Sequence, residues 1–408
     1  MNLGLSEEMQ KVREKIREFV EVDVAAVEKE YHDEVSVGDR WSHTPRQDEI
    51  MGSLKAKAKT LGLWNFFLPD SEVGGLSNLD YAYIAVELGK YPLGSESLNC
   101  SAPDTGNMEV FHRYGSAEMK ARWLKPLMEG EIRSAYLMTE PEVASSDATN
   151  IAMSCVREGD EYVLDGEKWW ATGAGDPRCA VYIVMVRTGG DDLPKHQRHA
   201  MIVVPADSPG IEVLRAMEVY GHDDAPHGHM HIRFTGVRVP AENLLLGEGR
   251  GFEIAQGRLG PGRIHHCMRA IGMAEAALEM MCRRGLEREA FGKPLAQLGA
   301  NHDIIAECRM EIEQARLLCL KAAWMMDQGD ARAAAPWIHQ IKVVAPRVAL
   351  KVVDEAVQLF GAQGISQDVP LSAMWTHLRT LRLADGPDAV HRRQVARAEL
   401  RRHTQEKV

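Results

Sequence analysis

The sequence predicts an α+β protein of several domains, with a helical first third, a strand-rich middle and a helical last third. Apolar residues recur every three or four positions near both ends, which is typical of amphipathic helices. Between them, short apolar runs are separated by turn residues, as in antiparallel sheets. The chain has 408 residues, 45% of them hydrophobic, which is too long for one ordinary domain. We place the domains at residues 1–133, 134–245 and 246–408.

Composition excludes several classes of protein. The formal net charge is −11 and no long basic tract occurs, which argues against nucleic acid as a partner. Seven cysteines, an odd number without a C-x-x-C pair, indicate reduced thiols. The first residues resemble neither an export nor a transit signal, and no run of about 18 apolar residues occurs. We therefore expect a cytoplasmic protein without a membrane span.

The first third is expected to form helices. Ser6 is expected to cap a helix that has Glu7 and Glu8 in its first turn. A helix is expected after Ser77 or Asn78, which are both favoured capping residues. The other expected segments are a polar loop at Tyr31–Pro45 and helices at Leu54–Leu61 and Glu118–Leu127.

The middle third is expected to form a small antiparallel β barrel or sandwich, of which we choose the barrel. A turn at Glu158-Gly159-Asp160 separates the first two strands. The expected strands are residues 151–155, 162–164, Cys179–Arg187, Ala200–Pro205, Ile211–Val219 and His229–Val239.

The last third is expected to form a four-helix bundle. A helix is expected to begin near Gly251, and apolar residues from Ile305 to Met326 predict a second long helix. Trp337–Phe360 predicts a third, which Pro346 is expected to kink.

Tyr136–Asp147 reads YLMTEPEVASSD and has no regular apolar period. It resembles the Y-x-L/M-T-E-P-x-A-G-S-D motif of the acyl-CoA dehydrogenases, flavoenzymes that desaturate acyl thioesters. The resemblance covers essentially the whole chain and implies FAD, at the junction of a helical domain, a β domain and a helical bundle. The matching segments are GLWNFF and the following PDSEVGG and ELG at 62–89, GEKWWATGAG at 166–175, REAFGKP at 288–294 and QLFGAQG at 358–364.

The resemblance assigns cofactor contacts residue by residue. Trp170 lies against the flavin, Thr139 and Thr172 hold its reactive edge, and Arg288 and Phe291 reach a flavin held by a neighbouring subunit. The complete set of implied cofactor residues is Tyr136, Met138, Thr139, Ser146, Trp170, Thr172, Arg288, Phe291, Gln358, Gly361, Ala362, Pro387 and Ala389. The chain departs from the family pattern at Gly173, at Leu298-Gly299 and at Ala362.

The resemblance also implies the catalytic base. Asp385, in the run ADGPD, takes the position of the family's catalytic Glu. Some members instead carry the base one residue before the Arg that matches Arg263, but here that residue is Gly262, which has no side chain. Read in isolation, Asp385 would be a helix-capping carboxylate. Arg263 and Ser146 are implied to contact the substrate.

The implied reaction is removal of an acidic α-proton of an acyl-CoA by Asp385, with transfer of the β-hydrogen to flavin N5 as hydride. Electrons would pass to an electron-transfer flavoprotein, and the enzyme would be a homodimer or homotetramer. The runs VASSD, GRLGPGRIHH and ADGPD most resemble one branch of the family, some members of which are fused to a phosphotransferase-like domain. Acyl chain length cannot be read from the sequence.

Three alternatives remain open. An acyl-CoA oxidase would share this chemistry but use O₂. A flavin monooxygenase or nitroalkane oxidase would keep the flavin motifs and act on other substrates. His227, His229 and His231 alternate, so one strand could present three imidazoles to a metal ion, and the protein would then be a metal-binding protein.

Overall fold

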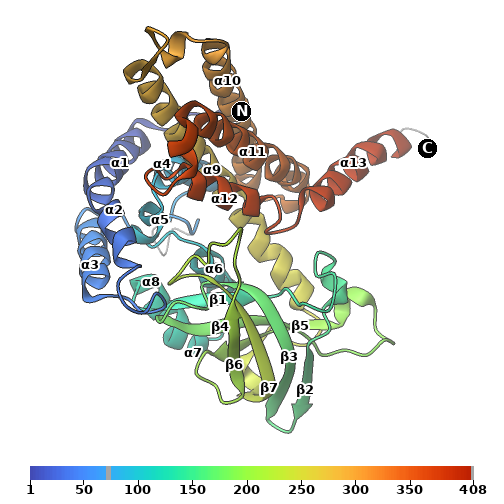
Figure 1. Ribbon diagram of the computed structural model, residues 1–408. Coiled ribbons are helices and arrows are strands. Elements are labelled where there is room, and N and C mark those ends of the chain that lie inside the picture. Colours follow the sequence, from blue (N-terminus) through green and yellow to red (C-terminus); the bar gives the residue numbers. More distant parts are fainter. Residues whose placement is uncertain (70–74, 406–408) are drawn as a thin grey trace. The chain divides into compact units, whose positions relative to one another are not determined.

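The computed structural model describes residues 1–69 and 75–405. Residues 70–74, which belong to the matching segment PDSEVGG, and residues 406–408 lie outside the described residues. The chain divides into two compact units. The helical unit comprises Met1–Glu28, Phe66–Ser97 and Gly260–Val408, and the sheet unit comprises Lys29–Asn65 and Leu98–Leu259. Along the chain, the predicted order of helices, strands and helices is confirmed (Figure 1).

The first third is helical, as expected. Ser6 accepts a hydrogen bond from the backbone of Met9, and Ser77 accepts one from the backbone of Asp80, so both predicted caps are confirmed. The helices are α1 (Glu7–Glu18), α2 (Ala25–Glu34), α3 (Pro45–Thr60), α4 (Asn78–Leu88), α5 (Leu93–Ser97), α6 (Asp104–Tyr114), α7 (Ala117–Met119) and α8 (Lys125–Glu129).

Two expectations for this region are wrong. The predicted loop at Tyr31–Pro45 begins only after Glu34, where α2 ends, and α3 begins at Pro45 rather than at Leu54. Thr44 and Gln47 form a reciprocal capping box that sets the start of α3. Helix α6 was not expected, because it buries polar side chains such as Asp104, which hides the apolar period of the sequence.

The middle of the chain forms an eight-stranded sheet in the order β6-β7-β3-β2-β4-β5-β8, with β1 paired to β4. Most pairs are antiparallel as predicted, but β1 and β4 run parallel, and β2 and β4 share one parallel bridge. The strands are β1 (Arg133–Leu137), β2 (Ser154–Glu158), β3 (Glu161–Thr172), β4 (Cys179–Arg187), β5 (His199–Pro205), β6 (Ile211–Ala216), β7 (His229–Pro240) and β8 (Leu244–Leu245).

The core of the sheet unit lies under the central strands. Tyr182, Val184 and Val186 of β4 alternate with residues of the other face and pack with Ala200, Ile202 and Val204 of β5 in one apolar cluster. Strand β1 was not predicted as a strand. Its start is attached to α6 by the buried carboxylate of Asp104, which accepts hydrogen bonds from Arg133 and Ser134.

The last third forms long helices. Helix α9 begins at Gly251, as predicted, and α11 continues as one helix through Pro346. Helix α11 packs against α10, α12 and α13. The elements are α9 (Gly251–Glu287), the hairpin strands β9 (Glu289–Ala290) and β10 (Lys293–Pro294), α10 (Asn301–Asp327), α11 (Ala331–Phe360), α12 (Leu371–Leu381) and α13 (Asp388–Gln405).

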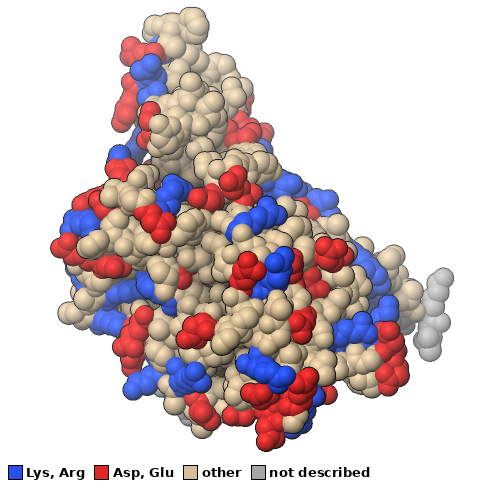
Figure 2. Space-filling view, turned by 60° about the horizontal axis from the view of Figure 1, so that its bottom comes forward, with Lys and Arg blue, Asp and Glu red and all other residues tan. Residues whose placement is uncertain are grey.

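Two further observations concern membrane-spanning helices and the distribution of surface charge. Within residues 1–69 and 75–405, none of the helices has the length and apolar character needed to cross a bilayer. On the face that Figure 2 shows, Lys and Arg side chains are interspersed with Asp and Glu rather than gathered in one basic area.

Candidate active site

Two of the matching motifs meet in the sheet unit. The Trp169 amide donates to the carbonyl oxygen of Thr139 at 3.0 Å. The Lys168 ammonium donates to the Met138 carbonyl at 3.0 Å and to the Glu140 carboxylate at 2.7 Å. Lys168 is fully buried, and burial lowers its pKa to about 8 in spite of the attraction of Glu140. The segment after β1 and the end of β3 are therefore held together by backbone and ionic bonds.

Trp170 and Thr172 lie at the end of β3, where its pairing with β7 shifts register between Lys168 and Ala171. Trp170 has a left-handed backbone with φ 55°, and its side chain is 36% exposed. The Thr172 hydroxyl is 2.9 Å from Nδ1 of His229, the residue opposite it on β7. The Trp170 ring lies 5.8 Å from the same imidazole. This irregularity presents a large aromatic ring at the end of β3.

The loop after β1 is held in shape by its own polar groups. The Glu140 carboxylate accepts from the backbone amides of Ala152 and Met153 at 2.8 and 2.9 Å. The Ser145 hydroxyl accepts from the Glu140 amide at 2.9 Å, and Ser146 beside it is exposed. These bonds keep the predicted cofactor segment in one conformation.

Tyr136 and Met138, two of the predicted cofactor residues, are half-buried at the end of β1. The guanidinium of Arg258 lies over the Tyr136 ring at 3.9 Å from its centre. Tyr136 therefore has one ring face occupied by a cation from the start of α9.

The three histidines do not converge on one point. His229 contacts Thr172, whereas the His231 imidazole is 2.8 Å from the Glu167 carboxylate. Burial lowers the pKa of both His227 and His229. In the described part of the chain, no three His, Cys, Asp or Glu side chains gather as a metal-binding group. These contacts give no support to the metal-binding alternative.

In the helical unit, the predicted adenine-side residues occupy exposed positions near two helix ends. Phe291 is 97% exposed at the tip of the β9–β10 hairpin, where its φ is 51° and that of Gly292 is 76°. The Arg284 guanidinium packs over the Phe360 ring at 5.3 Å and so joins the end of α9 to the end of α11. The predicted residues that are exposed around these ends are Arg288, Phe291, Gln358, Gly361 and Ala362.

Asp385 lies in the turn between α12 and α13, with a left-handed φ of 53°. Its main-chain oxygen accepts from the Arg263 guanidinium at 3.2 Å and from His391 Nε2 at 3.2 Å. Since His391 donates from Nε2, its neutral ring accepts at Nδ1 from His339, 2.9 Å away. Burial lowers the pKa of both histidines to about 4, so they are neutral near pH 7. The Asp385 backbone is therefore held by side chains from α9 and α13, and His339 of α11 holds the ring of His391.

Lys342 of α11 holds the preceding residues of the same turn. Its side chain is fully buried, and its ammonium donates to the carbonyl oxygens of Leu381 at 2.6 Å and Ala384 at 2.8 Å. Burial lowers the pKa of Lys342. The unpaired carbonyls at the end of α12 thus receive a cation, as helix C-termini favour.

The carboxylate of Asp385 has a neighbour on α9. His266 Nε2 is 3.6 Å from Asp385 Oδ2, and the two side chains are 23% and 22% exposed. Pro387 and Ala389 flank Asp388, whose carboxylate is bound by Arg382 at 2.6 Å. Sequence reasoning missed His266, Lys342 and His391. Lys342 had a signal, because it lies at helical spacing on the apolar stripe of α11.

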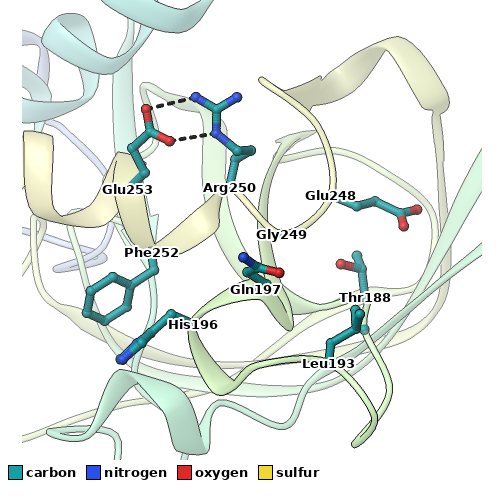
Figure 3. A pocket seen from close by; sticks show the side chains of 10 residues that line it. Thr188, Leu193, His196, Gln197, Glu248, Gly249, Arg250, Phe252 and Glu253 are labelled. Atoms are coloured by element: carbon teal, nitrogen blue, oxygen red, sulfur yellow. Dashed lines mark hydrogen bonds and ion pairs between the residues drawn. The ribbon is translucent and has the colours of Figure 1, made fainter.

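A cavity of about 490 Å³ lies in the sheet unit, between the loop after β4 and the start of α9 (Figure 3). Arg250 and Glu253 pair across its rim, and the His196 ring packs against Phe252 at 4.8 Å. None of the predicted site residues lines this cavity. It is therefore separate from the sequence-predicted residues of its own unit.

Comparisons with known proteins point to one family. Three of its domain models match in order: the acyl-CoA dehydrogenase N-terminal domain at residues 6–131, the middle domain at 135–235 and the C-terminal domain at 249–400. Acyl-CoA dehydrogenase family member 11 of Gallus gallus is 51% identical over 396 residues, which are 96% of this chain and 50% of that protein. The chain thus spans about half the length of that relative.

Two further similarities extend over whole chains. FadE2 of Mycobacterium tuberculosis, described as a probable acyl-CoA dehydrogenase, is 49% identical over 403 residues, which are 98% of each chain. The solved structure of butyryl-CoA dehydrogenase from Megasphaera elsdenii is 28% identical, with a TM-score of 0.82 over 98% of this chain and 100% of that one.

Proposed function

The chain belongs to the acyl-CoA dehydrogenase family, and we propose that it removes the α and β hydrogens of an acyl-CoA thioester with FAD as cofactor. The observation that carries this proposal is the setting of Asp385. Its backbone is held by Arg263 and His391, while its carboxylate remains partly exposed. A carboxylate fixed in this way is suited to take a proton from a bound substrate.

The residues present fit a flavin. Trp170 offers an exposed indole face beside the Thr172 hydroxyl, which suits a flat apolar ring with a polar edge. At Gly361, with φ 67°, an added Cβ would meet nothing within 4 Å, so the backbone there is open to a phosphate or a ribose. Bound FAD would supply the acceptor for the β-hydrogen, as a hydride at N5.

The other predicted cofactor residues would divide between the two units. In the sheet unit, Tyr136, Met138, Thr139 and Ser146 would lie along the isoalloxazine. In the helical unit, the exposed set around Phe291 and Gly361 would hold the adenine half, and Pro387 and Ala389 would contribute at the start of α13. The exposure of Phe291 suits a contact with a flavin of another subunit, as in a homodimer or homotetramer.

Three side chains of the protein would act on the substrate, each in a different role. Asp385 would take the α-proton, and the Arg263 guanidinium, whose Nε is bound to the Asp385 carbonyl, would present its remaining N–H groups to the coenzyme A part. Ser146, exposed on its loop, would be a further substrate contact. We propose an electron-transfer flavoprotein as the partner that reoxidises the enzyme, and fatty acid β-oxidation as its setting.

The test is anaerobic stopped-flow reduction of the FAD-loaded protein by a panel of acyl-CoA esters. We expect Asp385→Asn to keep FAD. Its rate of flavin reduction should fall by several orders of magnitude, because an amide cannot accept the proton. Asp303→Asn, at an exposed site in the first turn of α10, is the control. Reduction of Asp385→Asn at the wild-type rate would contradict the proposal, and rapid reoxidation by O₂ would assign an oxidase instead.

A further inference from the structure

We propose that His266 is a positioning residue for Asp385: a neutral imidazole that donates from Nε2 to Oδ2 of the carboxylate and leaves Oδ1 to take the substrate proton. The inference rests on the proposed role of Asp385 and adds a residue to which the resemblance assigns no role. It starts from the facing pair His266 Nε2 and Asp385 Oδ2, 3.6 Å apart in the helical unit.

Arg269 sets the tautomer of His266. Its Nη2 lies 3.1 Å from His266 Nδ1, one turn away on α9. A guanidinium has only N–H donors, so Nδ1 must be the acceptor in this bond. A neutral ring that accepts at Nδ1 carries its proton on Nε2, the nitrogen that faces Asp385.

The surroundings keep this ring neutral. Burial, Arg269, Lys342 and His377 all disfavour the charged form, and only Asp385 favours it, which together lower the pKa of His266 to about 3. The titratable and charged groups that face it thus come from α9, α11, α12 and the turn after α12. His266 would therefore act as a neutral donor throughout the usual working range of pH.

The distance of 3.6 Å is longer than a hydrogen bond. Contacts of catalytic groups commonly shorten when substrate binds and water leaves, and neither of these two side chains is fully buried. Asp385 has one torsion fewer than a glutamate, and its main chain is already held by Arg263 and His391. A donor on Oδ2 would then fix the remaining side-chain rotation.

The proton balance is simple. The α C–H bond breaks, its proton goes to Asp385 Oδ1, and its electron pair expels the β-hydrogen as hydride to the acceptor. His266 keeps its own proton on Nε2, and Arg269 takes no part in the proton transfer. The donor would also favour the ionised carboxylate before the reaction, which keeps Asp385 ready as a base.

Two substitutions separate the donor from the volume of the ring. In His266→Phe the ring remains but the donor is lost, and we expect flavin reduction to slow by about 10- to 100-fold. The dissociation constant for acyl-CoA and the FAD content should change little, and the acid limb of the kcat/KM profile should move to higher pH. His266→Gln places an amide donor near the former Nε2 and should recover most of the rate and the pH profile.

A readout independent of turnover is ¹⁵N NMR of histidine-labelled protein, with His266→Gln to assign the signal. We expect the proton on Nε2 in the wild type, and a mixture of tautomers in Arg269→Met. His265→Phe is the matched control, because its ring packs against Tyr81 at 4.5 Å on the neighbouring position of the same helix. It should leave the rate of flavin reduction and the pH profile unchanged.

The outcomes distinguish the two proposals. Wild-type rate and pH profile in His266→Phe, with Asp385→Asn inactive, would overturn the role of His266 alone. A proton on Nδ1 in the wild type would also overturn it. Activity in Asp385→Asn would instead overturn the function proposed for the turn itself.

Discussion

The ammonium of Lys342 lies 2.8 Å from the main-chain oxygen of Ala384, the residue immediately before Asp385. The same ammonium is 2.6 Å from the carbonyl oxygen of Leu381, the last residue of α12. A fully buried lysine on α11 thus binds the turn by its backbone rather than pairing with a carboxylate at hydrogen-bond distance. Because a buried cation is costly unless its hydrogen bonds are made, α11 and the turn are coupled.

We predict that Lys342→Met destabilises the protein by about 1–3 kcal/mol, since two buried carbonyls lose their donor. Flavin reduction by acyl-CoA should also slow, because the Asp385 turn is no longer held. Urea unfolding and stopped-flow reduction measure the two effects. Lys351→Met is the control on the same helix, where the lysine is 40% exposed and pairs with Glu311. Equal effects of the two substitutions would contradict the prediction.

Trp170 permits a test that separates its ring from its backbone. Trp170→Ala should lose FAD during dialysis more readily than the wild type, because the indole would cover one flavin face. At φ 55°, alanine is also strained, whereas glycine is not. Trp170→Gly should therefore lose FAD as readily as Trp170→Ala while folding at least as stably. FAD retained only in the glycine variant would attribute the loss to strain.

Phe291 occupies the first position of a two-residue hairpin turn with φ values typical of a type I′ turn. Asparagine followed by glycine is the preferred pair there, so Phe291→Asn should leave the unfolding free energy unchanged or raise it by up to about 1 kcal/mol. The lost ring should nevertheless weaken FAD retention, measured by absorbance after gel filtration. Phe291→Tyr keeps an aromatic ring and should retain FAD. Full FAD content in Phe291→Asn would exclude the proposed adenine contact.

Glu109 predicts a pH dependence of stability. Burial raises its pKa to about 7 from 4.5, despite Arg113 at 3.4 Å. The folded chain therefore binds this proton more tightly than the unfolded chain. The stability that the bound proton contributes is complete below pH 4.5 and is lost as pH rises through 7.

The substitution Glu109→Gln should remove this dependence. Between pH 5 and pH 8, the unfolding free energy of this variant should rise progressively relative to that of the wild type, by on the order of 3 kcal/mol at most. Melting temperatures measured across this pH range follow the change. Glu118→Gln, at an exposed position, should show no such trend. A constant difference between wild type and Glu109→Gln across this range would refute the assignment.

The sequence predicted the regular elements where one face is apolar without interruption. Strand β4 has the predicted range Cys179–Arg187, and α10 includes the expected stripe from Ile305 to Met326. Family membership, predicted from the motif at Tyr136–Asp147 and its companions, is confirmed. The expected domain boundaries and the roles of the site residues stay predictions.

Elements with mixed composition were missed. Helix α6 buries Asp104 and Asn107 among its apolar residues, and α12 was not expected at all. Strand β1 was missed because five residues beside the TEP motif are too few to show a period. Their burial depends on partners that a local pattern does not contain.

The sequence by itself determined that Gly262 cannot supply a base and that a carboxylate stands at position 385, because these are chemical facts of single residues. Only the tertiary structure decided what surrounds that carboxylate. Lys342 holds the backbone before it, and His266, whose tautomer Arg269 sets, faces its oxygen. Lys342 comes from α11, and His266 and Arg269 come from α9. Only folding brings these two helices within the few ångströms of the Asp385 turn over which hydrogen bonds and charges act.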